Sequence, residues 1–427
     1  MQTLELQKIA NEVRKGIVTG VHSAKAGHPG GSLSAADIFT YLYFEEMNID
    51  PKNPTDPDRD RFVLSAGHGS ALLYSLFNIF GYGTTIEDLK NFRQFESATP
   101  GHPEYGMAKG IETTTGPLGQ GIANAVGFAL AESHLAAEFN KPGFNVVDHY
   151  SYALCGDGCL MEGVSAEAAS LAGTLGLGKL IVLYDSNKIT IEGSTSIAFT
   201  ENVRERFDAY GWQTLVVEDG NDIESIGKAI EAAKAETSKP SLIEIKTTIG
   251  YGAPNKQGKA SAHGEPLGEE EIALAKKNLG WEYTEPFYVP EEVKAEMDKF
   301  RAEAIAKEEA WNKMFGRYCE EYPEMEEKWR IWHSEELPVD LLEDEDFWTY
   351  EGDIATRASS EKVLQKLSKL VPNLFGGSAD LGPSNKSVMK DRQYYSKENP
   401  SGSNIHYGIR EFAMTVIANS LALHGGL

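Results

Sequence analysis

The sequence predicts an α/β protein with a doubly wound parallel sheet, followed by a second, truncated α/β domain. Two apolar runs, at 151–156 and 179–187, flank an Ala-rich stretch at 164–175, and this strand–helix–strand order is typical of a βαβ unit. Two more apolar runs, at 213–222 and 241–248, flank a helical stretch at 223–236. Repeated units of this kind build a doubly wound sheet, in which ligands bind beyond the carboxyl ends of the strands.

The segments before these units alternate between helix and strand. Residues 2–20 carry apolar side chains at helical spacing, and a Gly-rich stretch at 27–31 separates them from a second helix at 33–47. RFVLS (61–65) then predicts a strand and SALLYSLFNIF (70–80) a helix. We therefore assign residues 1–318 to one large α/β domain.

The remainder divides into a linker and a partial second domain. Residues 319–351 are Glu-rich and predict a solvated helical linker. Residues 352–427 predict a helix at 359–370, a strand within NLFGGSADL and a helix within GIREFAMTVIANSLAL. A domain with only these strands and helices would leave a sheet edge open. We therefore expect the chain to be a fragment of a longer protein or to need a partner.

Composition excludes several classes of protein. Asp and Glu number 64 against 40 Lys and Arg, and a net charge of −24 repels nucleic-acid backbones while allowing small phosphorylated ligands. The sequence shows no signal peptide and no apolar run long enough to span a membrane. Its three cysteines form no disulfide framework, which favours a cytoplasmic location.

Histidines lie beside glycines more often than chance predicts. About a tenth of all residues are glycine, so about two of the ten histidines should have a glycine neighbour by chance. Five of them do. We interpret His424 as structural. The other four, His28, His68, His102 and His263, predict exposed side chains on turns that bind an anion or move protons. For any single one of these histidines, an equally good explanation is that loops are rich in both glycine and surface histidine. Zinc is disfavoured, because no ligand pair has the required spacing.

Two neighbouring loops predict a site for a hard cation. Asp157 follows one strand within GDG and Asn187 follows the next, so both should open on the same sheet edge. A carboxylate, an amide oxygen and a main-chain carbonyl such as that of Ile189 suit Mg²⁺ or Ca²⁺, and Mg²⁺ would in turn hold a diphosphate. A plain turn is the alternative explanation for GDG alone.

A third glycine-rich loop, TTTGPLGQG (113–121), precedes a predicted helix. Gly116, Gly119 and Gly121 allow the backbone to approach a ligand, and the free amides at the helix start favour an anion or an aromatic ring edge. A helix start capped by threonine is the alternative.

Taken together, these motifs resemble the transketolases, a family of thiamine diphosphate enzymes. The resemblance covers nearly the whole chain in the family's order. The matching segments are AKAGHPGGSLSAADI, DRDRFVLSAGHGSALLY, TPGHPE, TTTGPLGQGIANAVG, GDGCLMEGVSAEA, DSNKITIEG, ATRASS, GGSADLGPSN and IHYGIREFAM.

The resemblance implies a diphosphate-binding domain at 1–318 and part of a pyrimidine-binding domain at 352–427, with the family's C-terminal domain absent. It implies reversible transfer of a two-carbon ketol unit from a ketose phosphate to an aldose phosphate through a thiamine diphosphate carbanion, in the pentose phosphate pathway. It also implies a homodimer with active sites at the subunit interface.

The resemblance also assigns roles to individual residues. Asp157, Asn187 and the Ile189 carbonyl would hold Mg²⁺, with Ca²⁺ as a substitute, and His68 and Gly156 would contact the diphosphate. The Gly116 carbonyl would meet the cofactor's amino group, Leu118 would pack on its thiazolium ring, and His263 would also contact the cofactor. His28, His102 and His263 would bind sugar hydroxyls and move protons, and Arg357 and Ser384 would hold the sugar phosphate.

Glu411 matches the family's catalytic glutamate at the cofactor pyrimidine. Because it precedes FAMTVIANSLAL, we expect it to begin a buried helix and to be sequestered from water with a raised pKa. A favourable interaction with the helix dipole is the alternative explanation. Phe412 departs from the family, which has histidine after this glutamate.

Two other functions remain open from the sequence. The chain could be a catalytically silent fragment that binds Mg²⁺ and thiamine diphosphate, or a sister ketol transferase such as dihydroxyacetone synthase. A separate C-terminal polypeptide that completes the site is a further partner to consider.

Overall fold

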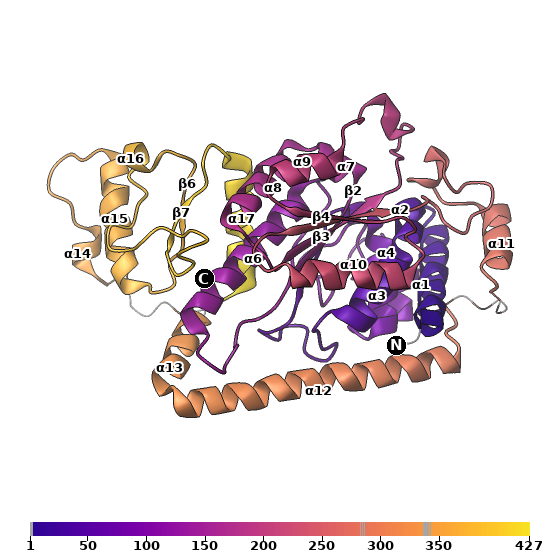
Figure 1. Cartoon of the computed structure of the whole chain (residues 1–427), viewed down its shortest axis with the longest axis horizontal. Helices are drawn as coiled ribbons and strands as arrows, with labels where there is room; N and C mark the ends of the chain where they lie inside the picture. The colour runs from indigo at the N-terminus through magenta and orange to yellow at the C-terminus, as the bar shows by residue number, and fades with distance from the viewer. Residues whose placement is uncertain are drawn as a thin grey trace.

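A five-stranded, fully parallel sheet forms the centre of the computed structural model, which describes residues 3–427 except 282, 284, 286, 335, 337–340 and 342 (Figure 1). The strand order is β1-β2-β3-β5-β4. The strands are β1 (Arg61–Leu64), β2 (Ser151–Gly156), β3 (Leu180–Ser186), β4 (Gln213–Val217) and β5 (Ser241–Lys246). This arrangement confirms the predicted α/β fold class.

The strands with the most apolar residues lie at the centre of the sheet. Every residue of β3 is buried, as are the first five of β2, because helices cover both faces of a parallel sheet. β4 is an edge strand and is only partly buried. The register pairs Gly156 with Asp185, so the loops that follow β2 and β3 start side by side.

Helices cover both sides of this sheet. α6 (Gln120–Phe139) packs against β1, β2 and β3, with α8 (Gly163–Leu175) beside it, whereas α10 (Ile223–Ala235) packs on β4 and β5 from the other side (Figure 1). The remaining helical elements of this domain are α1 (Thr3–Ala24), α2 (Pro29–Ser34), α3 (Ala36–Tyr41), a π-helix (Leu42–Glu46), α4 (Ser70–Phe80), α5 (Ile86–Lys90), α7 (Asp157–Met161), α9 (Val203–Ala209), α11 (Glu269–Asn278) and 3₁₀ turns at Gly67–Gly69, Thr195–Ile197 and Ala260–Ala262.

A long helix, α12 (Glu291–Glu321), runs along the base of the molecule and leads into α13 (Pro323–Trp332) (Figure 1). The predicted linker is therefore helical over much of its length, although the boundary that we set at 318 falls inside α12. Tyr318 is fully buried and donates a hydrogen bond to the Phe139 carbonyl at 2.6 Å. Part of the linker, including 337–340, lies outside the described residues.

The second domain contributes a two-stranded parallel sheet, β6 (Gly376–Ser378) with β7 (Asn404–His406). Its helices are α15 (Thr356–Leu370), α16 (Gly382–Asn385) and α17 (Glu411–His424), and the short α14 (Glu345–Trp348) precedes them in the linker. α17 packs chiefly on α6 and α8 of the first domain rather than on its own small sheet (Figure 1). No helix among the described residues is long and apolar enough to cross a bilayer.

The crossing of α17 and α6 depends on small side chains. A Cβ added to Gly127 would lie 2.0 Å from the Ser420 hydroxyl oxygen and 2.8 Å from the Ile417 carbonyl oxygen. Real Cβ atoms do not approach other atoms this closely, so glycine at 127 sets the distance between the two helices.

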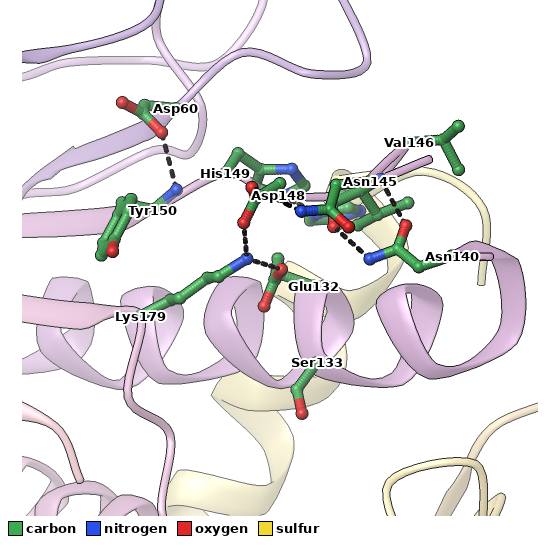
Figure 2. A network of polar contacts seen from close by, with 12 residues as sticks. Asp60, Glu132, Ser133, Asn140, Asn145, Val146, Asp148, His149, Tyr150 and Lys179 are labelled. Atoms are coloured by element: carbon green, nitrogen blue, oxygen red, sulfur yellow. Dashed lines mark hydrogen bonds and ion pairs between the residues drawn. The ribbon is translucent and has the colours of Figure 1, made fainter. Parts of the chain in front are cut away.

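A polar network closes the amino ends of β2 and β3 (Figure 2). Lys179 donates to Glu132 on α6 at 2.6 Å and also pairs with Asp148, while Asp60 accepts from the Tyr150 amide at 2.6 Å. Burial raises the pKa of Glu132 to about 7, and Lys179 opposes that shift. The network ties α6 to the start of both strands.

Beside this network, a buried histidine pair joins the two domains. His149 and His424 lie with their Nε2 atoms 2.8 Å apart, and the Nδ1 of His424 lies 2.8 Å from the Gly425 carbonyl. His424 must therefore donate through Nδ1 and accept through Nε2 from His149. Burial holds the pKa of both imidazoles well below 6.5. This agrees with the structural role predicted for His424.

Replacing Gly127 with alanine should destabilise the chain by about 1–3 kcal/mol, because the added methyl group overpacks the α6–α17 crossing. The matched control is Gly316→Ala on exposed α12, where a Cβ would meet no atom within 4 Å. That substitution should stabilise the helix by roughly 0.5–1 kcal/mol. Urea denaturation measures both, and equal stability of the two variants would contradict the crossing described above.

Acid should destabilise the folded chain through the histidine pair. Both imidazoles stay neutral when folded, whereas the unfolded chain binds protons below about pH 6.5, so stability falls as pH drops below that value. Below that pH, each such histidine lowers the free energy of unfolding by about 1.4 kcal/mol for each unit of pH. His149→Gln keeps a donor toward His424 and removes one titrating group, so unfolding free energies at pH 7.5 and 5.5 should differ less in this variant. The wild-type chain measured in parallel is the reference, and an equal pH dependence in the two proteins would contradict the role of the pair.

Candidate active site

A cavity of about 420 Å³ opens among the loops that follow β1, β2 and β3. Nine of the residues predicted from sequence line it. They are His28, His68, Gly116, Leu118, Gly156, Asp157, Asn187, Ile189 and His263. Segments that are far apart in the sequence thus supply one concave surface at the carboxyl ends of the strands, where ligands bind in folds of this class.

Two glycines let these loops converge. A Cβ on Gly30 would lie 2.6 Å from the Ala262 carbonyl oxygen, and a Cβ on Gly67 would lie 2.8 Å from the Gly116 amide nitrogen. Gly30 therefore brings the His28 segment against the His263 segment. Gly67 does the same for the segments that carry His68 and Gly116.

Four imidazoles form one cluster at the cavity. The ring of His28 lies 5.3 Å from that of His68, 5.9 Å from that of His263 and 6.2 Å from that of His102. His102 does not line the cavity, but a Cβ on Gly116 would lie 3.4 Å from its ring. The expectation that these side chains are exposed was wrong: all four are partly buried, because the converging loops cover one another.

Burial also sets the charge of this cluster. It lowers the pKa of His28 to about 4 and that of His68 to about 3, with the neighbouring imidazoles acting in the same direction. Burial lowers the pKa of His102 and His263 as well. The rings are therefore neutral near pH 7, and each carries one donor and one acceptor nitrogen.

The Nδ1 atoms of His28 and His263 are buried and have no hydrogen-bond partner among the described residues. An unpaired buried polar atom is costly, so the packing of the converging loops holds these two rings in place without a hydrogen bond at Nδ1.

The predicted cation ligands lie at the same cavity. Asp157 begins α7 and is 3% exposed, and its carboxylate accepts from the Tyr184 hydroxyl at 2.6 Å and from the Lys188 amide at 3.1 Å. Asn187 donates to Asp185 at 3.0 Å and accepts from the Ile189 amide at 3.1 Å. Between them, Lys188 has a φ of 63°, a strained conformation of the kind that clusters at functional loops.

These donors fit a hard cation that holds a phosphate. A buried carboxylate, an amide oxygen and a nearby main-chain carbonyl are oxygen ligands of the kind that Mg²⁺ prefers. Burial raises the pKa of Asp157, and a bound cation would favour its ionised form. No cluster of three or more His, Cys, Asp or Glu side chains able to hold a metal occurs in the described part of the chain.

Asp185 is a site residue that sequence analysis did not assign. It is buried at the end of β3 and accepts hydrogen bonds from Ser34 at 3.0 Å, from Thr247 and from Asn187. It thereby fixes the orientation of the Asn187 side chain and joins the loop after β3 to the end of α2 and to the segment after β5. Its place two residues before Asn187 was the available signal, but its partners lie far away in the sequence.

Besides His102, three predicted residues lie outside this cavity. Arg357 is near the start of α15, Ser384 is in α16 and Glu411 is the first residue of α17, and all three are exposed. α17 does begin at Glu411, as predicted, and the helix is buried along Ala413, Ile417 and Leu421. The Glu411 side chain is exposed in the single chain, so the sequestration expected for its carboxyl at a subunit interface stays a prediction.

Comparisons with known proteins agree with this geometry. Residues 6–338 match the family model "Transketolase, thiamine diphosphate binding domain", and residues 352–427 match "Transketolase, pyrimidine binding domain". The chain is 51% identical over 421 residues to the transketolase of Halalkalibacterium halodurans, covering 99% of this chain and 63% of that protein. It therefore spans a little under two thirds of the length of this relative.

Solved structures give the same result. The transketolase of Leishmania mexicana superposes with a TM-score of 0.95 at 44% identity, over 99% of this chain and 63% of that one. A Pichia stipitis transketolase in complex with sedoheptulose-7-phosphate gives the same TM-score and identity, over 100% and 64%. The fold and cavity place the chain in the class of α/β proteins that bind thiamine diphosphate. Within that class, it belongs to the transketolase family.

Proposed function

We propose that the chain supplies the cofactor site and part of the substrate site of a transketolase, which transfers a two-carbon ketol unit from a ketose phosphate to an aldose phosphate. The observation that carries this proposal is the convergence of nine predicted residues on one cavity, with a fourth imidazole beside it. Family membership and the sugar-phosphate complex of the Pichia stipitis protein support it.

Thiamine diphosphate, when bound, supplies the nucleophilic carbon and the electron sink that such a transfer requires. In our proposal Asp157, Asn187 and the Ile189 carbonyl hold Mg²⁺, for which Ca²⁺ can substitute, and the metal holds the diphosphate. His68 and Gly156 contact the diphosphate. Gly116 and Leu118 hold the organic rings. The Leu118 side chain has room in the cavity because Gly158 has no Cβ, which would lie 2.8 Å from it.

The neutral imidazoles of His28, His102 and His263 then bind sugar hydroxyls and move protons to and from them, with His263 also near the cofactor. The place of His28 and His263 in the lining of the cavity supports this role. Neutral imidazole suits it, because the same ring can donate one proton and accept another.

We further propose that Glu411 acts at the cofactor of a second copy of this chain, in a homodimer. Its neighbours Ile409 and Phe412 are 77% and 67% exposed, and apolar side chains flanking an exposed carboxylate favour a partner surface. Covering them would remove Glu411 from water and raise its pKa. Arg357 and Ser384, exposed on the same domain, would hold the sugar phosphate.

The relatives are longer than the chain, and we propose that a C-terminal polypeptide supplies the parts of the site that this chain lacks. Without it, the chain would bind Mg²⁺ and cofactor but remain catalytically silent. The three free cysteines are consistent with the proposed cytoplasmic location.

Cofactor binding should depend on Asp157. Asp157→Ala removes the proposed charged ligand, so Mg²⁺-dependent affinity for thiamine diphosphate should fall at least about 100-fold by calorimetry. Circular dichroism should show that the fold is retained. Glu192→Ala removes an exposed acidic group from the nearby loop and should bind like the wild type. Unchanged affinity in Asp157→Ala would remove the proposed metal site.

The proposed function is tested by ketol transfer between sugar phosphates, assayed with the chain alone and with an added C-terminal polypeptide. We expect transfer in the mixture, and Glu411→Gln should lower it at least about 100-fold while cofactor still binds. Exchange of the thiamine C2 proton for deuterium, followed by NMR, should slow in the same variant. Wild-type exchange in Glu411→Gln would refute its role, and absence of transfer in the mixture would favour the silent fragment.

A further inference from the structure

The carboxylate of Glu411 is not held by a contact of its own. Glu411 is the first residue of α17, and its side chain is exposed. Among the described residues none forms a hydrogen bond or an ion pair with this carboxylate, and Thr415 donates instead to the Glu411 main-chain carbonyl at 2.9 Å. The position of the carboxylate is therefore set by the backbone of the first turn of α17.

One anchor of that turn follows Glu411. The first amides of a helix have no partner within the helix, and a side-chain oxygen at the preceding residue often accepts from them. The residue before α17 is Arg410, which has no acceptor and makes no such cap. The cap comes from α8 instead, because the Glu167 carboxylate accepts from the Ala413 amide at 2.9 Å. A carboxylate at this end also interacts favourably with the helix dipole.

The second anchor precedes Glu411 and is the guanidinium of Arg410. Its Nη2 atom donates to the Ser170 hydroxyl on α8 at 2.9 Å, and its Nη1 atom donates to the Tyr407 carbonyl at 2.8 Å. Tyr407 is itself buried, at 1% exposed. One planar group therefore ties the segment between β7 and α17 to α8 of the first domain.

The backbone before α17 is shaped for this contact. Gly408 has a φ of 66°, and a Cβ there would lie 2.7 Å from Nη1 of Arg410. The Arg410 amide donates to the Gly408 carbonyl at 2.9 Å, and the Arg410 carbonyl accepts from the Met414 amide at 2.9 Å. Glycine at 408 thus provides both the backbone conformation of the turn and the space that the guanidinium occupies.

Both anchors reach the same face of α8. Glu167 and Ser170 are three residues apart, and residues at that spacing lie on one side of a helix. Their partners are residues 413 and 410, on either side of Glu411. The start of α17 is therefore held against the first domain, although it belongs to the second.

We propose that Arg410 is a positioning residue for Glu411: its guanidinium ties the start of α17 to α8 and, together with the Glu167 cap, fixes the backbone from which the Glu411 carboxylate extends. The anchor is a property of this chain alone. Its importance for catalysis rests on the proposed function, in which Glu411 acts at the cofactor of a second copy.

The first test is amide hydrogen exchange in the 427-residue chain, followed by NMR. In Arg410→Ala the Ala413 and Met414 amides should exchange at least about tenfold faster, because the first turn of α17 opens more readily. Ser170→Ala removes only the acceptor on α8 and should give a smaller increase. Arg330→Ala removes an exposed arginine of α13 and should change neither amide.

Wild-type exchange of both amides in Arg410→Ala would overturn the anchor, and so would an equal increase in Arg330→Ala. Residues 417–424 of α17 provide an internal reference, because this part of the helix is held by its packing and should exchange as in the wild type. An increase there as large as that at residues 413 and 414 would show that the whole helix loosens, which would also overturn the proposal.

The second test determines whether Arg410 acts through Glu411. In a mixture with the C-terminal polypeptide, Arg410→Ala should slow exchange of the thiamine C2 proton at least about tenfold, with cofactor affinity unchanged. Arg410→Lys reaches only one of the two acceptors at a time, so it should retain part of the rate. In the Glu411→Gln background Arg410→Ala should have no further effect, because the group that it positions has been replaced.

An equal loss of C2 exchange in both backgrounds would overturn the role of Arg410 as a positioning residue for Glu411. Absence of C2 exchange in the wild-type mixture would count against the proposed function. Amide exchange at the start of α17 would still decide whether Arg410 anchors the helix.

Discussion

The cavity depends on the close approach of backbone segments that glycine alone permits. Gly30 lies where a Cβ would meet the Ala262 carbonyl, and Gly67 lies where one would meet Gly116. If either segment moved outward, the imidazoles would separate and water would enter between them. Their burial, their lowered pKa values and their neutral state near pH 7 all follow from these two contacts.

Charge is distributed unevenly in this acidic protein. The net charge is −24, yet the imidazole cluster that faces the cavity is neutral. An anionic ligand thus meets neutral imidazoles, while Asp157 provides a carboxylate suited to a cation. The local arrangement can bind phosphorylated molecules that the molecule as a whole would repel.

The sequence was sufficient to predict the features of the fold that depend on residues close together along the chain. The strands at 151–156 and 180–186, the register-dependent pairing of the Asp157 and Asn187 loops and the start of α17 at Glu411 all follow from apolar runs and their spacing. The burial of His28 and His68 did not, because it comes from segments far away in the sequence. The exposure of Glu411 did not follow from the apolar run after it either, because it depends on which face of α17 packs on α6 and α8.

The packing of α17 on α6 has a consequence for biosynthesis. Synthesis proceeds from the amino terminus, so α6 leaves the ribosome long before residues 411–424 exist. At ~5–20 residues per second, the face of α6 around Gly127 waits for its partner helix on the order of tens of seconds. During that interval the nascent chain exposes the apolar face of α6, and a chaperone that binds apolar helix surfaces would protect it until α17 is synthesised.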